Sequence, residues 1–189
     1  MEKILFVNAC VRPESRTLLL ARQILSRLNG EIEEVNLEQE NIQPLNWQSL
    51  QERDNALQIG EQDAPILRYA RQFVEADVIV IAAPYWDLSF PAMVKAYFEA
   101  VTVCGMTFYY TPEGWPAGLC RARKLIYVTT SGGPIMEPDY GYGYIKALSD
   151  NFYGIPDSMI FKAENLDIIG ADVDGILEKV IKEINNSEL

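Results

Sequence analysis

Three groups of residues in this sequence are candidates for chemistry, and the first lies near the N-terminus. Arg12, Ser15, Arg16 and Thr17 stand between a short apolar run, residues 3–7, and a segment with helical periodicity. Hydroxyls, arginines and the free N–H groups at the start of a helix all favour an anion, and together they suit a phosphate. The residues alone leave a simpler interpretation open, in which Ser15 only caps the helix.

This first loop differs from the common nucleotide-binding motifs. It contains neither the Gly-Lys-Ser/Thr of a P-loop nor the pattern GxGxxG, which argues against a P-loop NTPase and against a dinucleotide-binding Rossmann site. The chain also has no histidine. Their absence excludes Ser-His-Asp and Cys-His catalysis and removes the commonest transition-metal ligand. An enzyme with this sequence would therefore use carboxylates, a hydroxyl or a bound organic cofactor, and no metal site is expected.

The second and third groups each follow an apolar run. Tyr85 and Trp86 come directly after residues 77–83, and large apolar side chains beside backbone polar groups suit a planar ring. Such aromatic residues also serve simply to close a core. The third group is TTSGGP, residues 129–134, where paired glycines allow a close approach of the backbone.

The order of the elements predicts how these groups meet. Five strands alternating with five helices indicate an α/β fold with a doubly wound, five-stranded parallel sheet and helices on both faces. The expected strands are residues 3–7, 31–37, 77–83, 124–129 and 157–162, and the expected helices are 15–28, 66–73, 91–101, 144–152 and 176–184. In such a sheet the carboxyl ends of the strands share one edge, so the three loops are expected to converge there.

Two segments fit this pattern poorly. Residues 38–60 are polar and weakly patterned, and residues 105–121 are rich in aromatic residues, glycine and proline. We expect both to be long irregular loops, which are often functional. No linker interrupts the chain, which predicts a single domain over residues 1–189.

Charge and cysteine content narrow the partners and the compartment. The net charge of −11 argues against binding to nucleic acid or to an anionic membrane. The N-terminus does not resemble a signal peptide, and no apolar stretch is long enough to span a bilayer. Three widely spaced cysteines predict neither disulfides nor a zinc site. A reducing cytoplasm is the expected location.

Taken in order, the motifs resemble those of the FMN-dependent NAD(P)H:quinone and azo reductases of the flavodoxin-like superfamily. The loop CVRPESRT is similar to their phosphate loop, APYWDLSFPAMVKAYFE to their APMYNFSIPAxLKxYxD stretch, and FYGIPD to their FxGIxD. GMTFYYTPEGWPAGLCRARKLIYVTTSGG resembles their GxTFxYxxxGPxGLLxxKKxxxxxSRGG. The match runs through nearly the whole chain and implies a flavodoxin-like fold.

The resemblance implies a site for FMN, with NADH or NADPH as co-substrate. Ser15, Arg16 and Thr17 would hold the phosphate, with Cys10 where the family often has serine. The ring would be lined by Pro84, Tyr85, Trp86, Asp87 and Leu88 and closed at its other edge by Thr130, Ser131, Gly132 and Gly133.

Two of these positions depart from the family pattern. Asp87 replaces a usual asparagine, and an ionised carboxylate cannot donate a hydrogen bond to a flavin carbonyl. Ser131 replaces a frequent arginine. Both substitutions bear on how the flavin is tuned.

The implied activity is hydride transfer from NAD(P)H through FMN to a quinone, an azo compound or a similar small acceptor, in a homodimer with its active sites at the interface. A flavin would also account for the absence of histidine, since it carries the hydride chemistry itself. Two alternatives stay open: a non-catalytic flavodoxin-like electron carrier, and a flavodoxin-fold binding module that has lost flavin. Residues 105–121 are expected to form a wall of the substrate pocket or to contact a dimer partner, which argues against the carrier.

Overall fold

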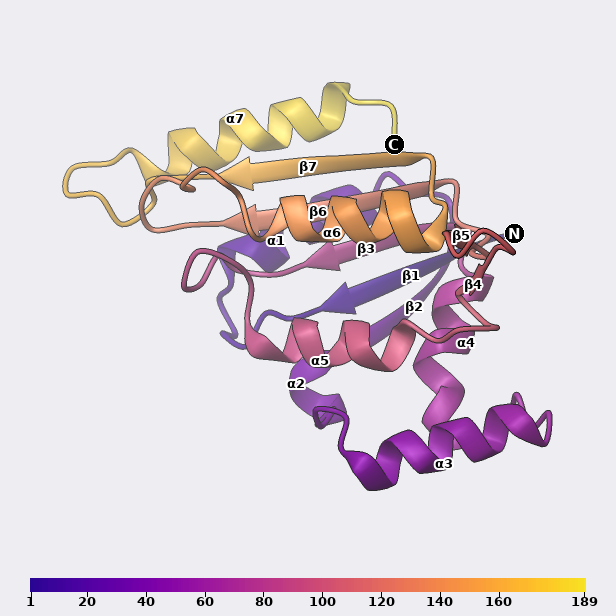
Figure 1. Ribbon diagram of the computed structural model, residues 1–189. Coiled ribbons are helices and arrows are strands. Elements are labelled where there is room, and N and C mark those ends of the chain that lie inside the picture. Colours follow the sequence, from indigo (N-terminus) through magenta and orange to yellow (C-terminus); the bar gives the residue numbers. More distant parts are fainter.

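The computed structural model describes residues 1–189. A five-stranded parallel sheet forms the centre of the protein (Figure 1). The strand order is β2-β1-β3-β6-β7, and all four neighbouring pairs are parallel. The strands are β1 (Glu2–Asn8), β2 (Gly30–Asn36), β3 (Val78–Ala82), β6 (Lys124–Thr130) and β7 (Asp157–Ala163). The predicted doubly wound α/β architecture is confirmed.

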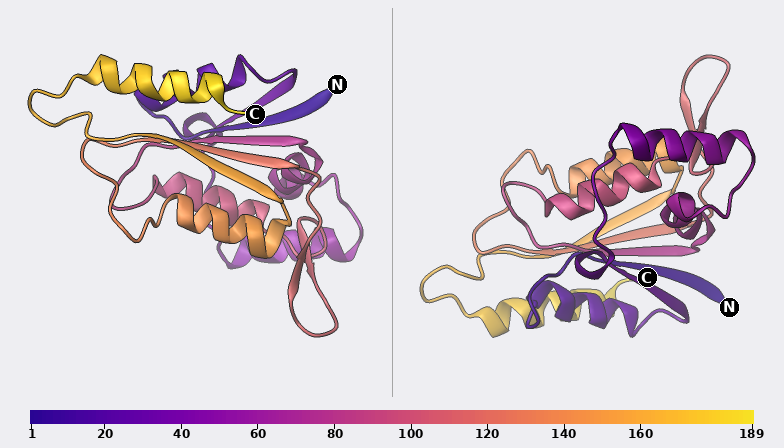
Figure 2. Two further views of the ribbon diagram at one scale, coloured as in Figure 1. Left: turned by 90° about the horizontal axis from the view of Figure 1, so that it is seen from above. Right: turned by 90° about the horizontal axis from the view of Figure 1, so that it is seen from below.

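Helices cover both faces of the sheet, as Figure 2 shows. One layer holds α1 (Arg16–Leu25) and α7 (Val173–Asn186), and the other holds α4 (Arg68–Glu75), α5 (Ala92–Val101) and α6 (Tyr142–Leu148). All five residues of the central strand β3, VIVIA, are buried. A strand that is covered on both faces has no polar side to alternate with, which explains its uninterrupted apolar run.

The strand alternation divides the interior into two apolar clusters. Ile4 and Phe6 point toward α1 and α7, while Leu5 and Val7 point toward the helices of the other layer. Successive side chains of a strand face opposite sides, so each central strand contributes to both clusters. This double packing fixes the position of the strand ends, where the three candidate loops begin.

The expectation of an irregular loop over residues 38–60 is wrong, because this segment contains two helices. They are α2 (Leu37–Glu40) and α3 (Trp47–Gln58). Only Ala56 of α3 is buried, so the helix lacks the apolar periodicity that would have indicated it. Its local signal is a reciprocal cap, in which the Asn46 side chain accepts from the Ser49 N–H and the Ser49 side chain accepts from the Asn46 N–H.

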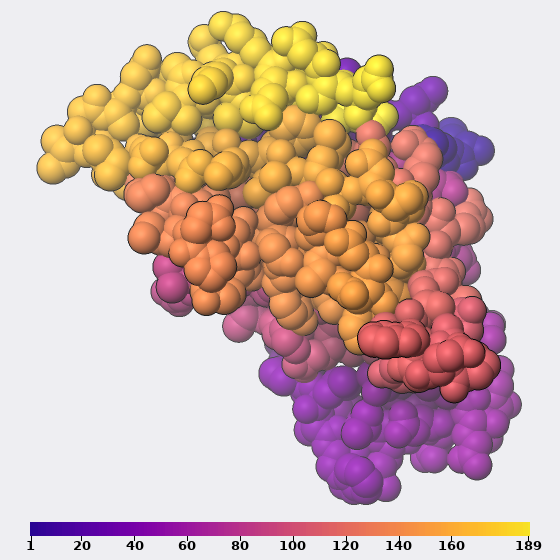
Figure 3. Space-filling view, turned by 45° about the horizontal axis from the view of Figure 1, so that its top comes forward, coloured from indigo at the N-terminus to yellow at the C-terminus, as the bar shows by residue number.

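The aromatic segment 105–121 forms a two-stranded antiparallel hairpin of β4 (Phe108–Tyr110) and β5 (Pro116–Gly118). It lies at the amino ends of the sheet strands, because α5 has carried the chain back from the carboxyl edge (Figure 1). In the space-filling view the hairpin and the segment that contains α3 form one end of the molecule (Figure 3). The prediction that residues 105–121 form a wall of the chain's own substrate pocket is therefore wrong.

Some helix boundaries also differ from the prediction. Helix α1 ends at Leu25 rather than at the expected residue 28, and β2 begins at Gly30, one residue before the expected start. A single 3₁₀ turn, η1 (Pro65–Leu67), precedes α4, and a π-helical turn, η2 (Ser149–Tyr153), extends α6. None of the helices combines the length and the apolar character needed to cross a membrane.

Candidate functional site

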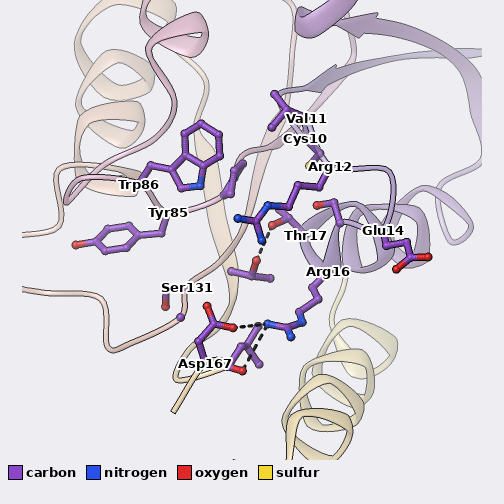
Figure 4. Close-up of a pocket in the computed structure, with 15 residues that line it drawn as sticks. Cys10, Val11, Arg12, Glu14, Arg16, Thr17, Tyr85, Trp86, Ser131 and Asp167 are labelled. Carbon is purple, nitrogen blue, oxygen red and sulfur yellow. Dashed lines mark hydrogen bonds and ion pairs between the residues drawn. The ribbon is translucent and has the colours of Figure 1, made fainter. Parts of the chain in front are cut away.

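A cavity of about 270 Å³ lies at the carboxyl edge of the sheet, where the loops after β1, β3, β6 and β7 meet (Figure 4). Its lining comprises Cys10, Val11, Arg12, Glu14, Ser15, Arg16, Thr17, Pro84, Tyr85, Trp86, Thr130, Ser131, Gly132, Leu166 and Asp167. The cavity thus collects segments from opposite ends of the sequence, as the crevice rule for parallel sheets requires.

The N-terminus of α1 supplies the polar end of the cavity. Ser15 is the N-cap, and its hydroxyl oxygen accepts the Leu18 N–H at 3.2 Å. The N–H groups of Arg16 and Thr17, in the first turn, have no partner inside the helix and carry the positive end of its dipole. Ser15 therefore serves as a cap, as the simpler interpretation held, and at the same time borders a cavity suited to an anion.

Two contacts fasten this helix start to the opposite wall. The buried Thr17 hydroxyl pairs with the Thr130 hydroxyl at the end of β6, with 2.7 Å between the oxygens. The Arg16 guanidinium forms an ion pair with Asp167 beyond β7, with 2.9 Å between Nη1 and Oδ1. Arg16 also donates to the Leu166 carbonyl at 3.5 Å. Residues that lie 150 positions apart in the sequence, Arg16 and Leu166, thereby belong to one site.

The turn before α1 is held by a buried asparagine that the sequence did not single out. The Asn8 side chain accepts the Cys10 N–H at 3.0 Å and donates to Glu34 at 2.8 Å. The thiol of Cys10 points to the Ala82 carbonyl, 3.8 Å away. Burial raises the pKa of the Cys10 thiol, although a hydrogen bond with Ser15 acts in the opposite direction. Cys10 is therefore a neutral buried wall of the cavity.

Tyr85 and Trp86 form the aromatic end of the cavity. The Tyr85 N–H donates to the Thr130 carbonyl, which continues the pairing of β3 with β6. Trp86 keeps 40% of its surface exposed, so it is available to a ligand rather than closing the core. Beyond it, Trp86 and Ser89 exchange two backbone hydrogen bonds around a two-residue turn.

Asp87 and Leu88 make the tip of this turn and do not line the cavity. Both have positive φ angles, 50° and 67°, as a type I′ turn requires at its two central positions. Aspartate tolerates this conformation better than leucine does. The departure from asparagine at position 87 thus falls on a turn tip, outside the cavity lining.

The loop after β6 is tied to the loop after β7. Ser131 accepts the Leu166 N–H through its carbonyl, and Gly132 accepts the Asp167 N–H. A side chain at Gly132 would meet the Asp167 carboxylate, since a Cβ there would lie 2.4 Å from Oδ2. Gly133 lies outside the cavity lining, and its carbonyl accepts the Ser131 hydroxyl at 2.6 Å.

Ten of the thirteen candidate site residues line the cavity, and Asp87, Leu88 and Gly133 do not. Five lining residues were absent from the set that the resemblance implied, although Arg12 was named with the first candidate loop: Val11, Arg12, Glu14, Leu166 and Asp167. The first three lie in the candidate loop itself. The last two follow β7, and the pairing of β7 with β6 in the structure places that loop beside the one after β6.

Comparison with known proteins agrees with this architecture. The model of the flavodoxin-like fold family matches residues 2–187. The chain belongs to this family. The flavodoxin-like chain is 37% identical to the FMN-dependent NADH:quinone oxidoreductase 2 of Clostridium acetobutylicum over 196 residues, which cover 97% of this chain and 96% of the relative. It is 34% identical to the FMN-dependent NADH:quinone oxidoreductase of Coprothermobacter proteolyticus, with 97% and 96% covered.

A solved structure shares the same architecture. The azoreductase from Bacillus anthracis str. Sterne superposes on the flavodoxin-like chain with a TM-score of 0.85, at 25% identity and with 97% of each chain covered. The resemblance in fold therefore extends over almost the whole length of both chains.

Proposed function

We propose that this flavodoxin-like protein is an FMN-dependent oxidoreductase that uses NADH or NADPH to reduce a quinone, an azo compound or a similar small acceptor. The observation that carries the proposal is the cavity at the carboxyl edge, which joins an anion-binding helix start to an exposed aromatic wall. The relatives, which are FMN-dependent NADH:quinone oxidoreductases, support the cofactor and the reaction class.

The polar end of the cavity fits a terminal phosphate. The two unpaired N–H groups of the first turn of α1, the Ser15 and Thr17 hydroxyls and the nearby arginines form a donor set suited to one compact anion. No second set of this kind adjoins the aromatic end. The site therefore fits a mononucleotide flavin better than a dinucleotide.

The other end of the cavity fits the ring. The partly exposed Trp86 and Tyr85 offer apolar surface, while the backbone of Ser131 and Gly132 approaches without a bulky side chain between. Bound FMN would supply the hydride transfer between the nicotinamide and the acceptor. The protein's residues then position the ring and limit the access of water to it.

Two contacts hold the walls at a fixed separation before any ligand enters. The Arg16–Asp167 ion pair and the Thr17–Thr130 hydrogen bond both cross the polar end. The Tyr85 hydroxyl accepts the Met136 N–H at 3.2 Å and so anchors the loop after β6 against the aromatic wall. Such preformed walls reduce the ordering that binding would otherwise require.

The proposal includes a homodimer that covers the face of α5 and α6. Two adjoining hollows of about 490 and 280 Å³ lie there and share Lys95 and Tyr144. Tyr140 at their rim is 56% exposed, and Trp115 of the hairpin is 72% exposed. Figure 2 shows the hairpin projecting on the same side of the sheet, where a second copy would contact it. Exposed apolar surface of this kind marks an interface.

A reducing cytoplasm is the proposed location. The three cysteines are free, and Cys104 is exposed. An exposed thiol persists in a reducing compartment but is prone to oxidation outside one.

Three measurements test the function. The purified protein should show the absorbance of a flavin that heat releases and that is identified as FMN, and the apoprotein should bind FMN more tightly than riboflavin. Steady-state oxidation of NADH or NADPH by a quinone separates an enzyme from an electron carrier, because a carrier would not turn over this pair. A colourless protein that takes up no FMN would instead be the binding module that has lost flavin.

The oligomer is tested by sedimentation velocity, and the proposal expects a dimer at micromolar concentration. Tyr140→Ser should shift the protein toward the monomer, whereas Leu19→Ser on α1, in the helix layer on the opposite face of the sheet and 47% exposed, is the control. A monomer at all accessible concentrations would contradict the dimer and leave the flavin proposal in place.

A further inference from the structure

We propose that Arg12 supplies the positive charge that neutralises the phosphate of the bound flavin, while Arg16 acts as a strut between two loops. This inference rests on the proposed function. It assigns different tasks to two arginines that stand four residues apart and line the same cavity. The resemblance had implied Arg16 alone.

Arg12 is free to meet a ligand. Its guanidinium makes no hydrogen bond and no ion pair, although the side chain lines the cavity, and it points across the cavity toward the side of Tyr85 and Trp86 (Figure 4). The turn at Pro13 and Glu14 returns the chain, so that Arg12 and the start of α1 face the same space. The guanidinium can therefore approach an anion held at the first turn of the helix.

Arg16 is already engaged. It pairs with Asp167 at 2.9 Å and donates to the Leu166 carbonyl at 3.5 Å. Turning its guanidinium toward a phosphate would break both contacts and leave Asp167 as an unpaired anion on the rim. The Arg16 backbone N–H still faces the ligand as part of the helix start.

The local charges leave Arg12 as the only unpaired cation in the lining. Two arginines and two carboxylates line the cavity; the Arg16 and Asp167 charges compensate each other, and the Glu14 side chain points away from the cavity (Figure 4). The surrounding segment, residues 9–30, holds four arginines and one acidic residue in a chain of net charge −11. An anion approaching this protein is thus repelled at a distance and attracted at this segment.

Flavin titration of the apoprotein tests the assignment. FMN and riboflavin, which differ by the phosphate, are titrated into the wild type, Arg12→Gln, Arg12→Lys and Arg16→Gln, with flavin fluorescence as the readout. Arg22→Gln is the matched control, since this residue lies further along α1 and outside the cavity lining. Circular dichroism melting confirms that each variant is folded.

Arg12→Gln should weaken FMN binding by about 5- to 50-fold, which extends below the usual range for hydrogen bonds to charged groups because Arg12 is solvent-exposed. Its riboflavin affinity should stay within about twofold of the wild type, and Arg12→Lys should restore part of the loss. Added salt should weaken FMN binding by the wild type more than by Arg12→Gln. Arg16→Gln should affect FMN and riboflavin alike, since it loosens a wall.

Two results would overturn the assignment. One is Arg12→Gln with unchanged FMN affinity, and the other is an equal loss for both flavins, which would make Arg12 structural. A folded wild type that binds neither flavin would instead overturn the proposed function itself, and the inference with it.

Discussion

The hydroxyl pair of Thr17 and Thr130 allows a stability prediction in which burial decides which of the two single variants loses more stability. Thr17 is 1% exposed, whereas Thr130 is partly exposed. Thr17→Val leaves the Thr130 hydroxyl within reach of water, so the free energy of unfolding should fall by about 0.5–1.5 kcal/mol, the net value of one hydrogen bond. Thr130→Val strands the buried Thr17 hydroxyl without a partner, and the expected loss rises to about 1–3 kcal/mol.

The double variant Thr17→Val/Thr130→Val should cost less than the sum of the two, by about 1 kcal/mol, because no hydroxyl is then left unpaired. Urea unfolding of the apoprotein gives these differences. In a chain of this length each 1 kcal/mol also corresponds to about 2–4 °C in melting temperature. The reasoning fails if Thr17→Val costs as much as Thr130→Val, or if the two effects add.

Three further perturbations test other parts of the structure. Gly118→Ala should destabilise the protein by about 2–3 kcal/mol in urea unfolding, because its Cβ would lie 2.1 Å from the backbone of Tyr153; a loss below 1 kcal/mol would refute this. Burial opposes ionisation of Glu164, but the hydrogen bond from the Ile135 N–H and the ion pair with Lys162 together outweigh burial and lower the pKa of Glu164. Its stabilisation should therefore be complete above pH 4.5 and be lost as the pH falls through the lowered value; Glu164→Gln should flatten that part of the pH–stability curve. Trp115→Ala should change monomer stability by less than about 0.5 kcal/mol, because the ring is 72% exposed, and should weaken the dimer in sedimentation; a large drop in melting temperature with an intact dimer would show that the ring belongs to the core.

The location of the aromatic hairpin changes one argument made from the sequence. The segment 105–121 was expected to argue against an electron carrier by walling the substrate pocket. Because the hairpin lies at the amino edge, that argument fails, and the enzyme proposal depends on the cavity and the relatives instead. A helix that follows a strand of a parallel sheet returns the chain to the opposite edge, so the sequence order of strand, helix and hairpin already indicates this location.

Helix α3 was missed in the sequence for a different reason. A helix is recognised in a sequence chiefly by its apolar stripe, and α3 buries only Ala56. Caps such as the one between Asn46 and Ser49 are short and common, so they indicate a helix start without indicating its length.

The sequence by itself determined the parallel sheet and the three loops of the site. Runs such as VIVIA fit only a strand covered on both faces, and strands separated by helices must run parallel, so their following loops share one edge. Only the tertiary structure decided which side chains at that edge are free. Asp167 lies 151 residues from Arg16 and engages it, while Arg12 has no partner. Pairing across such a separation depends on the packing of β7 beside β6, and no local pattern encodes it.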